Sequence, residues 1–244
     1  MVMKNLIRVF AFAGMVGLLP SAVATIEPPE TQLTRQPLKI VEQVTPVYPA
    51  KVVRQGITSG AVHVFIEVDR HGRLADTLAA GYTHADFVEP VMVALRQWKF
   101  EPALVGGQPV DTVEDFAVRF TSAAQVTLDR HPDAAMRADL YRGFVYQACS
   151  MNELDRVLHA KRMISPEMPA AADGSRVSGA VKVDFFVDED GNVRMPVAVS
   201  TGQDDLESAA LDAIRRWRFE RPLRDHRLVL VRGTHVFYIG LPAD

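Results

Sequence analysis

The sequence predicts an α+β protein made of two copies of one module, each a three-stranded antiparallel sheet packed on a single helix. The first observation is an internal repeat, because residues 60–101 match residues 179–220 at 14 of 42 positions without a gap. The second is a shared order of patterns: two alternating segments, one helical segment and a last alternating segment. The repeat spacing is far longer than a solenoid unit, so it indicates duplicated domains.

The first 24 residues have the layout of a secretory signal peptide. Lys4 and Arg8 precede an apolar run over residues 9–19, and small residues lead up to Ala24. The run is too short to cross a bilayer, which takes roughly 20 apolar residues. We expect cleavage after Ala24 and a periplasmic protein without a later membrane span. An uncleaved inner-membrane anchor facing the periplasm is the alternative.

The rest of the chain divides into four segments. Polar residues 25–43 are expected to form a loose N-terminal arm. The first module spans residues 44–121 and the second spans residues 164–241. Residues 122–163 between them are not rich in proline or glycine, which predicts a packed connector and not a flexible linker.

Each module opens with a strand in which apolar and polar residues alternate. Such a period of two predicts an antiparallel strand with one buried face. Turns at residues 69–72 and 188–191 end in a glycine, which tolerates the positive φ of a tight hairpin, and a return strand follows. The apolar positions are Val62, Val64, Ile66 and Val68 in the first copy, and Val181, Val183, Phe185 and Val187 in the second.

A helix follows each hairpin. The pairs Asp86 with Glu89 and Asp204 with Glu207 have the spacing of a capping box, which satisfies free N–H groups at a helix start. The helices lead into two aromatic pairs that we expect in the cores: Trp98, Phe100, Trp217 and Phe219. A last alternating segment closes each copy, with Phe116, Val118 and Phe120 in the first and residues 236–239 in the second.

The connector is predicted to be helical. Met136, Leu140, Phe144 and Ala148 recur at helical spacing, and residues 152–160 suggest a second short helix. The single cysteine, Cys149, has no partner for an internal disulfide and is expected to be a small buried side chain.

Composition and motifs argue against several classes of function. The formal net charge is −3, which lacks the basic excess of a nucleic-acid-binding protein. The histidines are scattered without metal-ligand spacing, and no phosphate-binding or nucleophile motif is present. We therefore expect no enzyme, no metal and no cofactor. The acidic turn at residues 188–190 is better explained as a hairpin than as a calcium loop, because a calcium loop would need a ligand where Phe186 stands and a glutamate near Val197.

A set of short motifs resembles the TonB C-terminal domain in order and spacing. They are P-V-Y-P (46–49), G-A-V-x-V (60–64), V-D-x-x-G (68–72), W-K-F-E-P (98–102) and G-x-P-V (107–110). The second copy diverges: P-E-M-P (166–169) lacks the tyrosine, and Arg221 is inserted before Pro222.

The resemblance implies a module that binds the TonB-box peptide of an outer-membrane transporter as an added strand. An exposed sheet edge presents unpaired backbone groups that an extended peptide can satisfy. We expect the binding edge in the first copy. The predicted contacts are Pro46, Tyr48, Pro49, Val113, Phe116, Val118 and Phe120.

Two alternatives stay open. The family's energy transducers have an N-terminal anchor and a long proline-rich spacer, and an uncleaved N-terminus would favour that function for this chain. Alternatively, the modules are structural and pair their own sheet edges, within one chain or in a homodimer. A binding protein without an anchor fits the sequence best.

Overall fold

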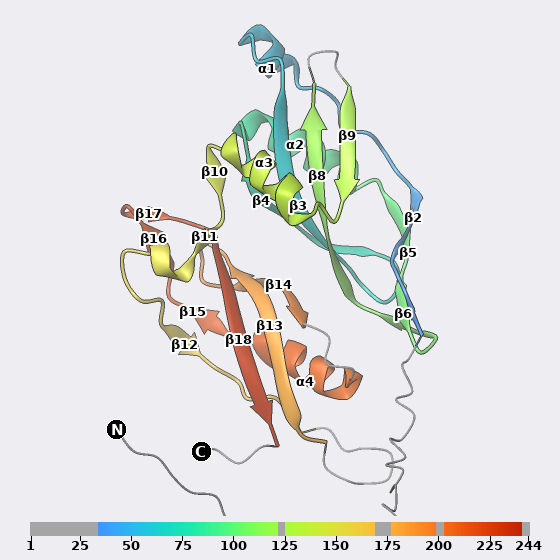
Figure 1. The fold of residues 1–244 in the computed structure, drawn as a ribbon, viewed down its shortest axis with the longest axis vertical. Coiled ribbons are helices and arrows are strands. Elements are labelled where there is room, and N and C mark those ends of the chain that lie inside the picture. Colours follow the sequence, from blue (N-terminus) through green and yellow to red (C-terminus); the bar gives the residue numbers. More distant parts are fainter. Residues whose placement is uncertain (1–33, 122–124, 169–176, 199–202, 241–244) are drawn as a thin grey trace, which may run out of the picture. The chain divides into compact units, whose positions relative to one another are not determined.

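The computed structural model describes residues 34–121, 125–168, 177–198 and 203–240 (Figure 1). It confirms a mixed α+β protein with two modules, each with a sheet against which a helix packs. The predicted number of strands is wrong. The first sheet has five strands in the order β10-β4-β3-β8-β9, and the second has four in the order β11-β18-β13-β14.

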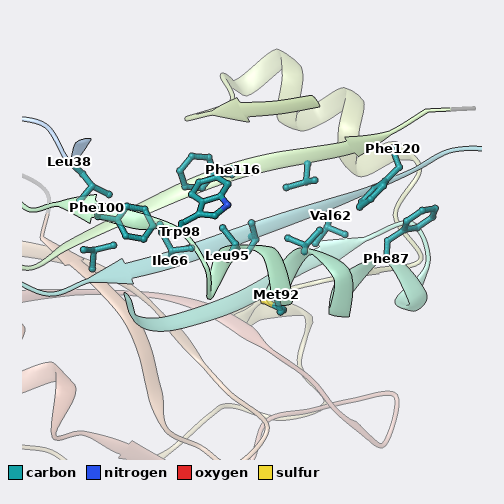
Figure 2. Packing of buried hydrophobic residues seen from close by; sticks show 14 of the residues in the cluster. Leu38, Val62, Ile66, Phe87, Met92, Leu95, Trp98, Phe100, Phe116 and Phe120 are labelled. Atoms are coloured by element: carbon teal, nitrogen blue, oxygen red, sulfur yellow. The ribbon is translucent and has the colours of Figure 1, made fainter. Parts of the chain in front are cut away.

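The first copy is built around β3, which pairs antiparallel with β4 and β8. Helix α2 covers the face of this sheet that carries Val62 and Ile66, as Figure 2 shows. Its elements are β3 (Gly60–Val68), β4 (Leu74–Tyr82), the 3-10 turn η1 (Ala85–Phe87), α2 (Val88–Leu95), β5 (Lys99–Glu101), β6 (Ala103–Val105), β7 (Gln108–Val110) and β8 (Thr112–Phe120).

The second copy repeats this plan around β13, which pairs antiparallel with β14 and β18. Helix α4 contributes Leu206, Ala210 and Ile214 to a core of its own. The elements are β13 (Gly179–Val187), β14 (Val193–Ala198), α4 (Asp204–Arg215), β15 (Arg218–Phe219), β16 (Leu223–Arg224), β17 (Arg227–Leu228) and β18 (Val231–Ile239).

The hairpin glycines are required by close backbone contacts that recur in both copies. Gly72 has φ of +76° and Gly191 has φ of +86°. A Cβ atom on Gly72 would lie 2.5 Å from the carbonyl oxygen of Phe100, and one on Gly191 would lie 2.2 Å from that of Phe219. Glycine is therefore needed for the backbone angle and for the space.

The two tryptophans fill equivalent places. Trp98 and Trp217 are 5% and 4% exposed and pack against Phe100 and Phe219, respectively. The indole N–H of Trp98 donates to the carbonyl oxygen of Val44 at 2.9 Å, and that of Trp217 donates to Ile164 at 2.8 Å. Each tryptophan thus joins its core to the chain that leads into its module.

The residues before the first module differ from the expected loose arm. β1 (Arg35–Gln36) pairs with β6 and β2 (Lys39–Glu42) pairs with β5, followed by α1 (Ala50–Arg54). Leu38 is only 1% exposed and belongs to the first core, which explains why this segment is held in place. The earlier part of the predicted arm and the predicted signal peptide lie outside the described residues.

The connector is less helical than predicted. It contains β9 (Val126–Arg130), α3 (Ala134–Arg142), β10 (Tyr146–Gln147), β11 (Cys149–Ser150), the 3-10 turn η2 (Met151–Glu153) and β12 (Ala160–Arg162). The first predicted helix ends at Arg142, where the chain turns to pair with β4. The predicted second helix is wrong beyond η2. Cys149 is 2% exposed.

The predicted capping boxes do not form. The N-cap residues of α2 and α4 are Phe87 and Gln203, and neither makes a side-chain cap. The carboxylate of Asp86 instead accepts a hydrogen bond from Lys51 at 2.8 Å. Capping spacing alone could not show that a 3-10 turn precedes α2.

The two copies belong to one compact unit of the chain and contact each other directly. The ring of Phe65 in β3 lies 5.0 Å from that of Phe186 in β13, centroid to centroid. Arg215 in α4 donates to Glu67 in β3 at 2.7 Å. The face of β14 that carries Met195 thereby packs against the first sheet. None of the helices in the described ranges is long and apolar enough to span a membrane.

Candidate partner-binding edge

The edge that the sequence predicts for partner binding is already paired. β9 adds to β8 as an antiparallel strand, with Phe116 opposite Arg130 and Phe120 opposite Val126. Arg130 also donates to Glu114 and to the carbonyl oxygen of Leu38, both at 2.8 Å. The expectation that β8 is an edge strand is therefore wrong, because the chain supplies its own next strand.

The predicted contact residues lie mainly in the first core. Phe116, Val118 and Phe120 are at most 1% exposed, whereas Val113 is half-buried in the contact with the second copy. The side chains of Phe116, Val118 and Phe120 are therefore not on the surface of the described chain. Peptide contact at these positions stays a prediction that the fold does not favour.

The proline and tyrosine segment has a packing role. Pro46 is buried, and Tyr48 and Pro49 are half-buried. The Tyr48 hydroxyl donates to the carbonyl oxygen of Ile57 at 3.0 Å, and its ring meets Phe87 edge-on. These contacts fix the entry of the chain into the first module, and a further contact with a partner stays a prediction.

Three other sheet edges carry features that hinder pairing. β10 covers the end of β4, where Tyr146 pairs with Tyr82. β14 contains Pro196 and a register shift near Met195, whose φ is +49°. Proline and bulges on edge strands block the approach of another strand. The short β9 carries Asp129 and Arg130, and charged side chains have the same effect.

The edge of β18 differs from all of these. β11 pairs in parallel with its first two residues, Val231 and Arg232. Within the described ranges, no strand pairs with this side of β18 from Gly233 to Ile239. This stretch contains no proline, no bulge and no Lys, Arg, Asp or Glu. We name residues 233–239 the open edge.

The orientation of the backbone on the open edge follows from one hydrogen bond. The N–H of Cys149 in β11 donates to the carbonyl oxygen of Leu230 at 3.0 Å. Backbone groups alternate in direction along a strand, so those of Thr234, Val236 and Tyr238 point to the same side as Leu230. These residues present the N–H and C=O groups that an added strand would need.

Side chains beside the open edge are mainly aromatic and apolar. Tyr238 is 71% exposed, while Phe237 is buried in the second core. His235 lies between them in sequence, and its ring is 4.8 Å from Trp217 and 4.7 Å from Phe237. Burial lowers the pKa of His235. His235 is therefore neutral at neutral pH, and residues 233–239 themselves present no charged side chain to an added strand.

Sequence reasoning missed this site because it placed the binding edge in the copy with the better motif match. One local pattern indicated that β8 is not an edge strand. Shortly after β8, apolar Val126 and Leu128 alternate with polar residues, as a further strand would require. Both pack against the first core. Among the described residues, no three His, Cys, Asp or Glu side chains gather as metal ligands.

Comparison with known proteins agrees with this architecture. The family model for the Gram-negative bacterial TonB protein C-terminal matches twice, at residues 44–122 and 165–238, which together make up more than half of the chain. A search of curated proteins found no match. The two matched regions coincide with the two modules of the fold. The chain belongs to the TonB C-terminal family and carries two tandem copies of its domain.

Proposed function

We propose that this protein is a periplasmic TonB-like binding protein whose second copy captures an extended peptide by strand addition at the open edge. The proposed partner is a TonB-box-like segment of an outer-membrane transporter. Membership of the family supports a protein partner for this chain, and the family is not catalytic. The family's domains act in the periplasm, which supports the proposed location.

One observation carries the proposal. The open edge is the stretch of the two main sheets where aligned backbone groups are neither paired by a described strand nor protected by proline, bulge or charge. Main-chain hydrogen bonds to such an edge supply affinity, and alternate side chains supply specificity. The first copy, whose equivalent edge is paired with β9, is proposed to act as a scaffold.

Binding to a panel of TonB-box peptides tests the proposal, with the purified protein titrated in a calorimeter. Val236→Pro removes an N–H that points away from β13, so the sheet is retained while the edge loses a donor. Val236→Ala is the matched control, because it shortens the same side chain and keeps the N–H. We expect at least ~10-fold weaker binding for V236P and little change for V236A. Failure of the whole panel to bind, or equal binding by V236P, contradicts the proposal.

Self-pairing of the open edge between two chains is the second candidate function. It is favoured by the same absence of charged residues from the open edge. Two β18 strands from two chains would then form a continuous sheet. Sedimentation velocity distinguishes the two functions: a dimer that V236P dissociates supports self-pairing, whereas a monomer that binds peptide supports capture. For the anchored transducer, N-terminal sequencing of the cellular protein decides, because an intact Met1 would support it.

A further inference from the structure

The first copy shows how a module of this chain is covered when its edge is paired. After β9, three residues lead into α3, and Asp133 caps that helix by accepting from the Met136 N–H at 2.7 Å. α3 then lies on the outer face of the first sheet, opposite α2 (Figure 1). Leu140 packs there on Ala61 and Ala117. The strand β9, a short turn and the helix α3 thus cover both the edge of β8 and the outer face of the first sheet.

Polar contacts hold α3 on that face. The Nδ1 atom of His63 lies 2.6 Å from the Tyr141 hydroxyl, and its Nε2 atom lies 2.9 Å from the Asp115 carboxylate. Arg137 of α3 pairs with the same carboxylate at 3.0 Å. His63 is fully buried as a result. The outer face of the first copy is therefore an interior surface.

Among the described residues, no helix covers the part of this face around Ala180 in the second copy, whereas the part around Phe186 packs against the first copy. The repeat offset places Ala180 at the position of Ala61, Lys182 at His63 and Val236 at Ala117. Ala61, His63 and Ala117 are all buried, whereas Ala180 and Lys182 are exposed and Val236 is half-buried. Tyr238, at 71% exposure, lies next to them on the same face. We name Ala180, Lys182, Val236 and Tyr238 the outer patch.

We infer that the partner segment bound at the open edge continues through a short turn into an amphipathic helix that packs on the outer patch. This inference rests on the proposed function, and it specifies the partner beyond a single strand. The helix presents small or apolar residues to Ala180, Val236 and Tyr238. Lys182 is exposed and its ion pair with Asp184 is long, at 3.8 Å, so an acidic residue of the helix is favoured beside it. The outer patch adjoins the open edge because Val236 and Tyr238 belong to both.

Two synthetic peptides of this chain serve as probes. Residues 125–144 supply the strand, turn and helix, and residues 125–131 supply the strand alone. Each is titrated into the isotope-labelled full protein, and backbone amide shifts are followed at the open edge and at Ala180 and Lys182. We expect the longer peptide to bind at least ~10-fold more tightly. Only the longer peptide should shift the amides of Ala180 and Lys182.

Substitutions separate the two parts of the surface. Ala180→Arg places a long charged side chain on the outer patch without touching the backbone groups of the open edge. It should remove the advantage of the longer peptide and leave binding of the shorter one unchanged. Val41→Arg, at a 55% exposed position on β2, is the matched control and should preserve both affinities. In the longer peptide, Leu140→Asp should have the same effect as A180R.

The results are decisive in either direction. Equal affinities of the two peptides, an A180R protein that keeps the difference, or shifts confined to β8 and Ala117 overturn the inference. If the helix inference fails but TonB-box peptides still bind and V236P weakens their binding, the proposed function is retained. If no peptide perturbs the open edge, both proposals fail.

Discussion

Arg194 of β14 in the second copy forms a two-pronged ion pair with Asp76 of β4 in the first. Its Nε atom donates to Oδ2 at 2.6 Å and its Nη2 atom to Oδ1 at 2.5 Å. Both side chains are less than one-third exposed. This pair, together with Met195 and Phe186, sets the outer side of β14 against the first sheet. It explains why β14 is unsuited to receive a partner while β18 stays open.

Loss of this ion pair should destabilise the protein. Arg194→Ala leaves the Asp76 carboxylate partly buried without its cation, and we expect the free energy of unfolding to fall by about 1–3 kcal/mol. Urea denaturation followed by circular dichroism measures the change. Arg73→Ala is the control, because Arg73 is 75% exposed and its partner Asp69 keeps the hydrogen bonds from the backbone N–H groups of residues 71 and 73, so this ion pair should contribute little. Equal stability of R194A and the unmodified protein contradicts the prediction.

The hairpin glycine of the second copy should resist substitution. Gly191→Ala adds a Cβ atom 2.2 Å from the Phe219 carbonyl oxygen at a φ of +86°. Gly107→Ala is matched for backbone angle, with φ of +80°, but its Cβ would meet nothing within 4 Å. We expect G107A to lower the free energy of unfolding by about 1 kcal/mol because of the backbone angle alone. G191A should lower it clearly more, because its Cβ also clashes with the carbonyl oxygen. Similar unfolding midpoints for the two variants would show that the contact is unimportant.

Tyr141 should contribute to stability through its hydroxyl. Tyr141→Phe leaves Nδ1 of the fully buried His63 without a hydrogen bond, which costs about 1–3 kcal/mol. Tyr238→Phe removes the same group from a 71% exposed side chain and should change little. Thermal and urea unfolding provide the comparison. An unaffected Y141F protein would contradict the idea that α3 is held by the His63–Tyr141 contact.

The stability of the protein should depend on His235 below neutral pH. Burial lowers its pKa from the ordinary value of 6.5, so the unfolded chain takes up a proton at a higher pH than the folded chain. Stability is therefore lost as the pH falls through 6.5 toward the folded pKa. His235→Gln should reduce the loss between about pH 7.5 and pH 5 measured by urea unfolding. His226→Gln, at a 97% exposed side chain, is the control. An unchanged pH dependence in H235Q would refute the prediction.

The sequence by itself determined the duplicated plan of this protein. The alternation around Val62 and Val181, the hairpin glycines and the two tryptophans are local patterns. They indicate half-buried strands, tight turns and core positions, respectively. The order of two hairpin strands, a helix and a last strand could be predicted because such patterns depend on neighbours in the chain. The family motifs are local in the same way.

Only the tertiary structure decided which edge is open. The pairing of β9 with β8, the seating of α3 on Ala61 and the contact of Arg194 with Asp76 join residues whose sequence patterns do not specify one another. Edge exposure is a property of the assembled sheets, since one added strand or one packed neighbour removes it. For that reason the predicted edge in the first copy was wrong, and the open edge lies on β18.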